Sequence, residues 1–89
     1  MAQAIVDPEQ LRRFASMLRH FNHELTEGAG KLSHEMSELS STWRDQEHRK
    51  FSAEFAEQMK LMTRLIENSE KHIPYLLRKA ELIEEYLRQ

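Results

Sequence analysis

The chain has 89 residues, with 13 Lys or Arg against 15 Asp or Glu, and it contains no cysteine. This length fits one domain, and 31% charged residues with only two glycines and two prolines are typical of long helices. The lack of cysteine excludes disulfides, the balanced charge argues against nucleic acid as a partner, and the lack of a run of about 20 apolar residues argues against direct membrane insertion.

The first predicted helix covers residues 8–40. Asp7 suits the N-cap and Pro8 the first helical position. Leucine then recurs every seven residues, and a second apolar row lies beside it. The leucine row is Leu11, Leu18, Leu25, Leu32 and Leu39, and the second row includes Phe14, Phe21, Gly28, Met36 and Trp43. Spacings of three and four residues predict a helix with one apolar stripe, as in a coiled coil.

A short turn is expected at residues 41–45, within the sequence "SSTWRD". Serine and threonine are poor in helix interiors and good at caps, and Thr42 or Asp45 is expected to cap the helix that follows. Trp43 lies one turn past Leu39 on the same face. Its ring is therefore expected to cover the end of the apolar core, in contact with Phe51 or its neighbours.

The second predicted helix covers residues 46–88. Its apolar row is Phe55, Met59, Met62, Ile66, Ser69, Ile73, Leu76, Ala80, Ile83 and Leu87, and a further row contains Phe51, Leu65 and Tyr86. Pro74 removes a backbone donor and clashes with the preceding turn. No cap residue or glycine accompanies it, so we expect a kink near Pro74 and not the end of the helix.

A connection of this length favours an antiparallel hairpin. We therefore predict an all-α fold in a single helical-hairpin domain over residues 1–89, with the small Gly28 opposite Met59 so that the helices approach closely. The apolar faces are wider than one partner helix covers, which predicts dimerisation into a four-helix bundle. The side chains expected in the dimer or bundle core are Leu11, Phe14, Leu18, Phe21, Leu25, Leu32, Leu39, Phe51, Phe55, Met59, Met62, Ile66, Ile73 and Leu76.

The other polar signals favour no catalytic or metal site. His20 and His23 lie on one helical turn, but a metal needs three or four converging ligands. His34, His48 and His72 are interpreted as surface or interface residues without a partner that the sequence can name. A two-helix hairpin also lacks a cleft that excludes water. We therefore expect no enzyme activity, no cofactor and no metal.

Three parts of the chain together resemble the WXG-motif family. They are "VDPEQLRRFA" at the start of the first helix, "LSSTWRD" at mid-chain, and the aromatic residues Phe51 and Phe55. Members of that family have about one hundred residues, are similar to the early secreted antigenic target and are exported by type VII secretion systems. Trp43 matches the family tryptophan, and Asp45 stands where the family has glycine.

The resemblance implies a function in protein–protein interaction. The chain is expected to be a substrate, partner or adaptor of a type VII-like (ESX-type) secretion system. Its expected partners are itself or a paralogous WXG protein, and a translocation ATPase of the FtsK/SpoIIIE type. In this family the tryptophan motif is also expected to combine with the C-terminal export signal of the partner chain.

The resemblance also predicts where the protein is found. The N-terminal sequence "MAQAIVDPEQ" does not resemble a signal peptide, so the protein is expected in the cytoplasm before export and then outside the cell without cleavage. The export signal of the family is Tyr-X-X-X-Asp/Glu. Tyr86 begins an incomplete copy, because its acidic position would follow Gln89, and Tyr75 is followed by Lys79. The alternative is a cytoplasmic helical adaptor or chaperone with no export role.

Overall fold

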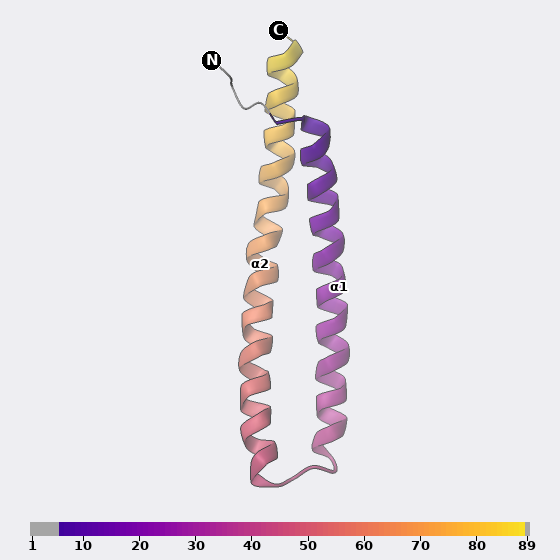
Figure 1. Ribbon diagram of the computed structural model, residues 1–89, viewed down its shortest axis with the longest axis vertical. Helices are drawn as coiled ribbons and strands as arrows, with labels where there is room; N and C mark the ends of the chain where they lie inside the picture. The colour runs from indigo at the N-terminus through magenta and orange to yellow at the C-terminus, as the bar shows by residue number, and fades with distance from the viewer. Residues whose placement is uncertain (1–5, 89) are drawn as a thin grey trace.

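The structure, a computed structural model, describes residues 6–88 and contains two α-helices joined by a short turn (Figure 1). Helix α1 runs from Pro8 to Ser40 and α2 from Gln46 to Arg88. The helices lie antiparallel and form a hairpin with dimensions of 67 × 23 × 15 Å. The expected all-α hairpin is confirmed, and its dimerisation stays a prediction.

The start of α1 follows from its first three residues. Asp7 has an extended backbone, and its Oδ1 accepts a hydrogen bond of 3.0 Å from the backbone N–H of Glu9. Pro8 then occupies the first turn, where its missing N–H leaves no bond unmade. The sequence therefore fixes this helix boundary by local chemistry alone.

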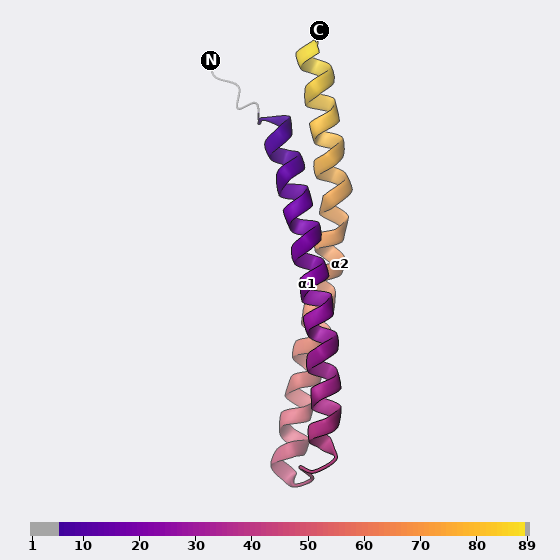
Figure 2. The ribbon, with the colours of Figure 1, turned by 90° about the vertical axis from the view of Figure 1, so that its right-hand side faces the viewer.

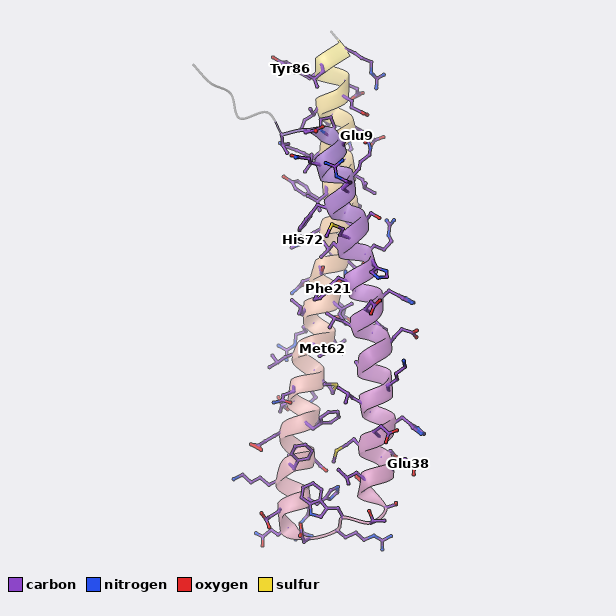
Figure 3. The ribbon with its side chains drawn as sticks, turned by 45° about the vertical axis from the view of Figure 1, so that its right-hand side comes forward. Glu9, Phe21, Glu38, Met62, His72 and Tyr86 are labelled. Carbon is purple, nitrogen blue, oxygen red and sulfur yellow. The ribbon has the colours of Figure 1, made fainter. Side chains whose placement is uncertain are left out.

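The seam between the helices buries mostly small or branched side chains. Ala15, Ile73 and Ala80 are buried, whereas larger seam residues such as Leu18 and Met62 are half-buried (Figure 3). Seen from the side, α1 crosses in front of α2 (Figure 2). Two helices have no further layer to cover the edges of their seam, so large side chains in the hairpin remain partly exposed.

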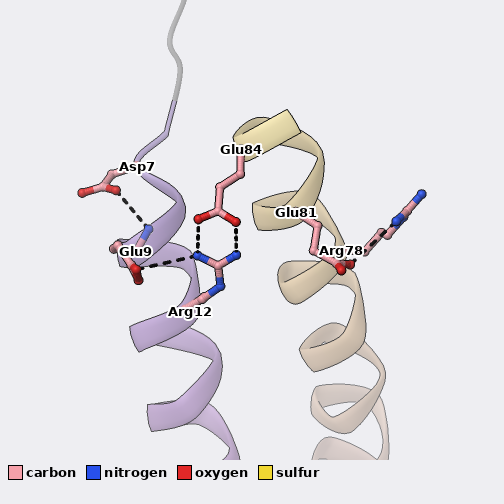
Figure 4. Close-up of polar contacts among 6 residues, drawn as sticks. All are labelled: Asp7, Glu9, Arg12, Arg78, Glu81 and Glu84. Atoms are coloured by element: carbon pink, nitrogen blue, oxygen red, sulfur yellow. Dashed lines mark hydrogen bonds and ion pairs between the residues drawn. The ribbon is translucent and has the colours of Figure 1, made fainter. Parts of the chain in front are cut away.

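Polar contacts link the helices at three heights. Near the turn, Ser40 Oγ lies 2.8 Å from His48 Nε2. In the middle, Asn22 Nδ2 donates a hydrogen bond of 3.1 Å to Glu70 Oε2. At the open end, the guanidinium of Arg12 donates two hydrogen bonds to the Glu84 carboxylate, one of them 2.8 Å long (Figure 4). An apolar seam tolerates a shifted register, whereas these three contacts form in only one register.

The contact between Arg12 and Glu84 also changes the acidity of both groups. The paired hydrogen bonds from Arg12 hold the pKa of the Glu84 carboxyl below its ordinary value, and they raise the pKa of Arg12. Glu9 lies 3.7 Å from the same guanidinium and adds a smaller electrostatic effect. The hairpin is thus closed at its open end by a charged group on each helix.

The expected close packing at Gly28 is wrong. A Cβ atom added at Gly28 would meet no atom within 4 Å, and the same holds for Gly30. At about 100° per residue, Gly28 is rotated away from the seam positions Leu25 and Ala29, toward the side of the hairpin. Its missing side chain therefore does not bring α1 closer to α2.

Helix α2 continues through Pro74, which is exposed. The proline still leaves the carbonyl of Glu70 without its usual amide partner, so the bend that we expect near Pro74 stays a prediction. Within residues 6–88, neither helix has a stretch long and apolar enough to cross a membrane.

Candidate functional site

The turn between the helices is closed by side chains that cap both helix ends. The Oγ of Ser41 donates to the carbonyl of Glu38 at 2.7 Å, and the Oγ1 of Thr42 donates to the carbonyl of Leu39 at 3.4 Å. Asp45 Oδ1 accepts a hydrogen bond of 2.9 Å from the backbone N–H of His48. Asp45 is therefore the residue that caps α2, while Thr42 bonds to the end of α1.

An aromatic cluster sits on this turn. The Trp43 ring lies 5.7 Å from the Phe51 ring, and Phe51 stacks on Phe55 at 6.4 Å between ring centres. The Trp43 ring also meets the ring of His48 edge-on at 5.2 Å. Trp43 and Phe55 are half-buried, whereas Phe51 is exposed. Trp43 thus connects the end of the seam to the outside of the hairpin.

His48 is the residue of this site that sequence reasoning missed. It is half-buried, and its Nε2 lies 2.8 Å from Ser40 Oγ and 3.1 Å from Ser52 Oγ. The hydroxyls and the Trp43 ring together fix the orientation of the imidazole. Ser52 follows His48 by four residues on the same helix face, and this spacing is the sequence feature that could have predicted their contact.

A row of exposed apolar side chains runs from the turn along one side of the hairpin. We call it the apolar flank, and it comprises Phe14, Phe21, Leu32 and Leu39 of α1 with Phe51 and Leu65 of α2. Between 44% and 57% of each of these residues is exposed to solvent. At about 100° per residue, the row on each helix is rotated from the seam toward the same side of the hairpin.

The residues predicted for the dimer or bundle core fall into two groups. Leu11, Leu18, Leu25, Phe55, Met59, Met62, Ile66, Ile73 and Leu76 are buried or half-buried in the seam. Phe14, Phe21, Leu32, Leu39 and Phe51 are exposed on the apolar flank (Phe21 is labelled in Figure 3). The structure thus separates side chains that pack within one hairpin from side chains that the hairpin leaves exposed, and the role of the exposed group in a dimer stays a prediction.

Tyr86 lies in the last turn of α2, far from the Trp43 turn, with 67% of its surface exposed (Figure 3). Tyr75 is also exposed, about three helical turns nearer the middle. The hairpin therefore carries its tryptophan and its C-terminal tyrosine at opposite ends. A second chain that lay beside the first and ran in the opposite direction would bring its Tyr86 near this Trp43.

Three of the remaining histidines lie on the outside of α1 in pairs with glutamate, and the fourth, His72, is exposed on α2. His20 Nε2 is 3.0 Å from a Glu24 carboxylate oxygen, and the pairs His23–Glu27 and His34–Glu38 are 3.8 and 3.7 Å apart. Each pair joins residues four apart on one exposed helix. Among residues 6–88, no group of three or more side chains is placed to hold a metal ion.

Comparison with known protein families matches residues 3–86 to the WXG100 family, described as proteins of 100 residues with WXG. No curated protein and no solved structure matches the chain. The family match spans both helices and the turn that carries Trp43.

Proposed function

The chain belongs to the WXG100 family of small helical proteins of the type VII secretion kind, and from this we propose that it is a substrate, partner or adaptor of a type VII-like secretion system. It acts by binding other proteins and not by catalysis. Its partners are a second copy or a paralogous WXG protein, and a translocation ATPase of the FtsK/SpoIIIE type.

The observation that carries this proposal is the continuity between the Trp43 turn and the apolar flank. Leu39 and Phe51 belong to the flank and stand on either side of the turn, and Phe51 contacts Trp43. Exposed aromatic and leucine side chains in one continuous row are typical of a protein–protein interface. Tryptophan is also among the residues that contribute most to binding energy.

The position of Trp43 suits recognition by a second chain. The indole is half-buried, and the caps of both helices are made by other residues, so its removal leaves the hairpin bonds in place. In an antiparallel dimer, the C-terminal segment with Tyr86 from one copy lies beside the Trp43 turn of the other. Each end of the dimer then carries one surface formed by the Trp43 turn of one chain and the Tyr86 segment of the other.

Export from the source cells tests this function. We expect the protein in the culture medium only when the gene for the translocation ATPase is intact. Trp43→Ala should keep the helical circular dichroism spectrum and lower export about tenfold or more, because tryptophan is among the residues whose truncation costs the most binding energy. Trp43→Phe, which keeps an aromatic ring, is the matched control and should retain part of the export.

Two outcomes would contradict the proposal. Export that does not depend on the ATPase excludes a type VII route. A folded protein that stays in the cytoplasm with an intact ATPase favours the alternative, a helical adaptor or chaperone with no export role.

A further inference from the structure

The two helices carry opposite charge on the sides that face away from each other. We call these sides the outer faces. The outer face of α1 is mainly acidic, with Glu9, Glu24, Glu27 and Glu38 against two basic residues, Arg13 and Lys31. The outer face of α2 is mainly basic and contains Lys50, Lys60, Arg64, Lys71, Arg78 and Lys79, with three glutamates, Glu57, Glu67 and Glu85. All of these side chains are exposed.

Several of these charges have no opposite charge within the hairpin. Among residues 6–88, Lys50, Arg64 and Lys79 make no ion pair. Glu24, Glu27 and Glu38 have only histidine partners, which carry charge only when they are protonated, whereas Glu9 lies 3.7 Å from Arg12. Glu57 and Lys60 pair with each other at 3.5 Å. Most of the charge on the outer faces is therefore available to another molecule.

The charges also match in their height along the hairpin. In an antiparallel hairpin, two residues equally far along the sequence from the turn lie at about the same height. Counted from Arg44, Glu38 and Lys50 are equally distant, and so are Glu24 and Arg64. Lys31 and Glu57 are a third such pair, in which the signs on the two helices are both reversed.

Similar matches occur near the open end. Glu9 lies at the height of Lys79, and Arg13 lies at the height of Tyr75, whose ring can receive a cation on its face. The complementarity therefore extends along the length of the hairpin. Because the two outer faces point in opposite directions, these residues cannot meet within one chain.

We propose that the acidic outer face of α1 in one copy binds the basic outer face of α2 in a second copy that lies beside it in the same orientation. This contact uses different residues from the apolar flank. It joins two unlike surfaces, so each copy retains one free outer face and further copies can add. Exposed ion pairs are individually weak and are screened by salt, so the association is weak and depends on several pairs acting together.

Sedimentation equilibrium at high protein concentration, with low and high salt compared, tests this contact. At about 0.01 M salt, where charges act over roughly 30 Å, we expect mass above the basal oligomer. At about 1 M salt, where they act over roughly 3 Å, this extra mass should disappear. The basal oligomer that remains at high salt reports the apolar flank, so failure of one contact is distinguishable from failure of the other.

Charge reversal identifies the surfaces. Lys50→Glu with Arg64→Glu removes the excess of basic charge from the outer face of α2, and Glu24→Lys with Glu38→Lys makes the outer face of α1 basic, like that of α2. Each double variant alone should lose the salt-sensitive association, and an equimolar mixture of the two should regain it. Arg19→Glu with Arg44→Glu is the control, because it changes the net charge as much as the first variant but on a side of α1 and in the turn. It should retain the association. Circular dichroism of each variant confirms that the helices form.

Three results would overturn the proposal. They are a wild-type mass that does not change between the two salt concentrations, a charge-reversed variant that still associates like the wild type, and a mixture that does not associate. Binding of wild-type protein to phosphatidylserine vesicles through Lys50 and Arg64, without self-association, would also overturn it and identify a membrane surface as the partner.

Discussion

At the scale of single residues, Asp45 explains how the turn forms without the glycine that the family has at this position. No residue among 6–88 has a positive φ, so the turn does not need the conformational freedom of glycine. Asp45 instead caps α2 through its carboxylate, which accepts the backbone N–H of His48. The change from glycine to aspartate therefore replaces a flexible residue with an N-cap.

We expect Asp45→Ala to lower the free energy of unfolding by about 1 kcal/mol, because alanine leaves the N–H of His48 without its acceptor. Asp45→Gly, which restores the family residue, should cost only a few tenths of a kcal/mol. Urea denaturation of the three proteins measures both values. Equal losses for alanine and glycine would show that the carboxylate does not stabilise the helix.

The turn also shows which residue contacts the sequence predicts. The contact between Trp43 and Phe51 was expected, because both belong to apolar rows that meet at the turn, and it is present. The contact between His48 and Ser40 was not, because these residues lie on different helices. Their distance depends on how the chain reverses at residues 41–45. The spacing of apolar residues along one helix predicts that helix but not the geometry of the turn.

At the scale of the helices, the pair Arg12–Glu84 makes the hairpin sensitive to acid. The pKa of Glu84 in the folded protein is below its ordinary value near 4.5, so the folded state favours the ionised carboxylate. This contribution to stability is fully present above pH 4.5 and is lost as the pH falls through the lower pKa of the folded protein. About a third of each side chain (33%) is exposed to solvent, which screens the pair, so the effect is small.

We therefore expect the wild type to lose more stability than Glu84→Gln when the pH falls from 5 to 3. The variant keeps the shape of the side chain but has no group that titrates at this position. Glu85→Gln, on the same helix turn, is the control and should behave like the wild type. Thermal unfolding at several pH values measures the difference, and identical pH profiles for wild type and Glu84→Gln would contradict the assigned role.

The apolar rows predict the helices correctly but not which leucines enter the seam. Leucine recurs every seven residues, whereas a straight helix has about 3.6 residues per turn, so the row drifts by about 20° with each repeat. Leu11, Leu18 and Leu25 accordingly lie half-buried, and Leu32 and Leu39 turn out onto the apolar flank. Asn22, with only 2% of its surface exposed, takes a seam position that no apolar pattern identifies.

At the scale of the whole molecule, the apolar flank predicts a dimer. Burial of one large apolar side chain contributes about 1.5–3 kcal/mol, and a small domain has only about 5–15 kcal/mol of stability in total. Two hairpins that pack flank to flank form a four-helix bundle and remove six such side chains of each chain from water. Two-fold symmetry is the commonest arrangement for identical chains.

We expect the wild type to sediment as a dimer at tens of micromolar and at high salt. Phe14→Ser with Phe21→Ser should shift it toward monomer, because both rings belong to the flank and are more than half exposed in one hairpin. Tyr75→Ser with Leu82→Ser removes two exposed side chains, 63% and 47% accessible, that lie off the flank, and it should leave the dimer intact. A stable, cooperative wild-type monomer would show that the flank does not bind a second copy.

The three polar contacts across the seam have a consequence for the order in which the hairpin folds. Ser40–His48 joins residues 8 apart in sequence, Asn22–Glu70 residues 48 apart, and Arg12–Glu84 residues 72 apart. The entropy lost on closing a loop increases with its length, so the contact beside the turn forms most readily from the unfolded chain. Once it has formed, each further contact closes only the segment beyond the previous one. Folding therefore proceeds from the Trp43 turn toward the two termini, and the helix ends around Arg12 and Glu84 are the first to separate when the protein opens.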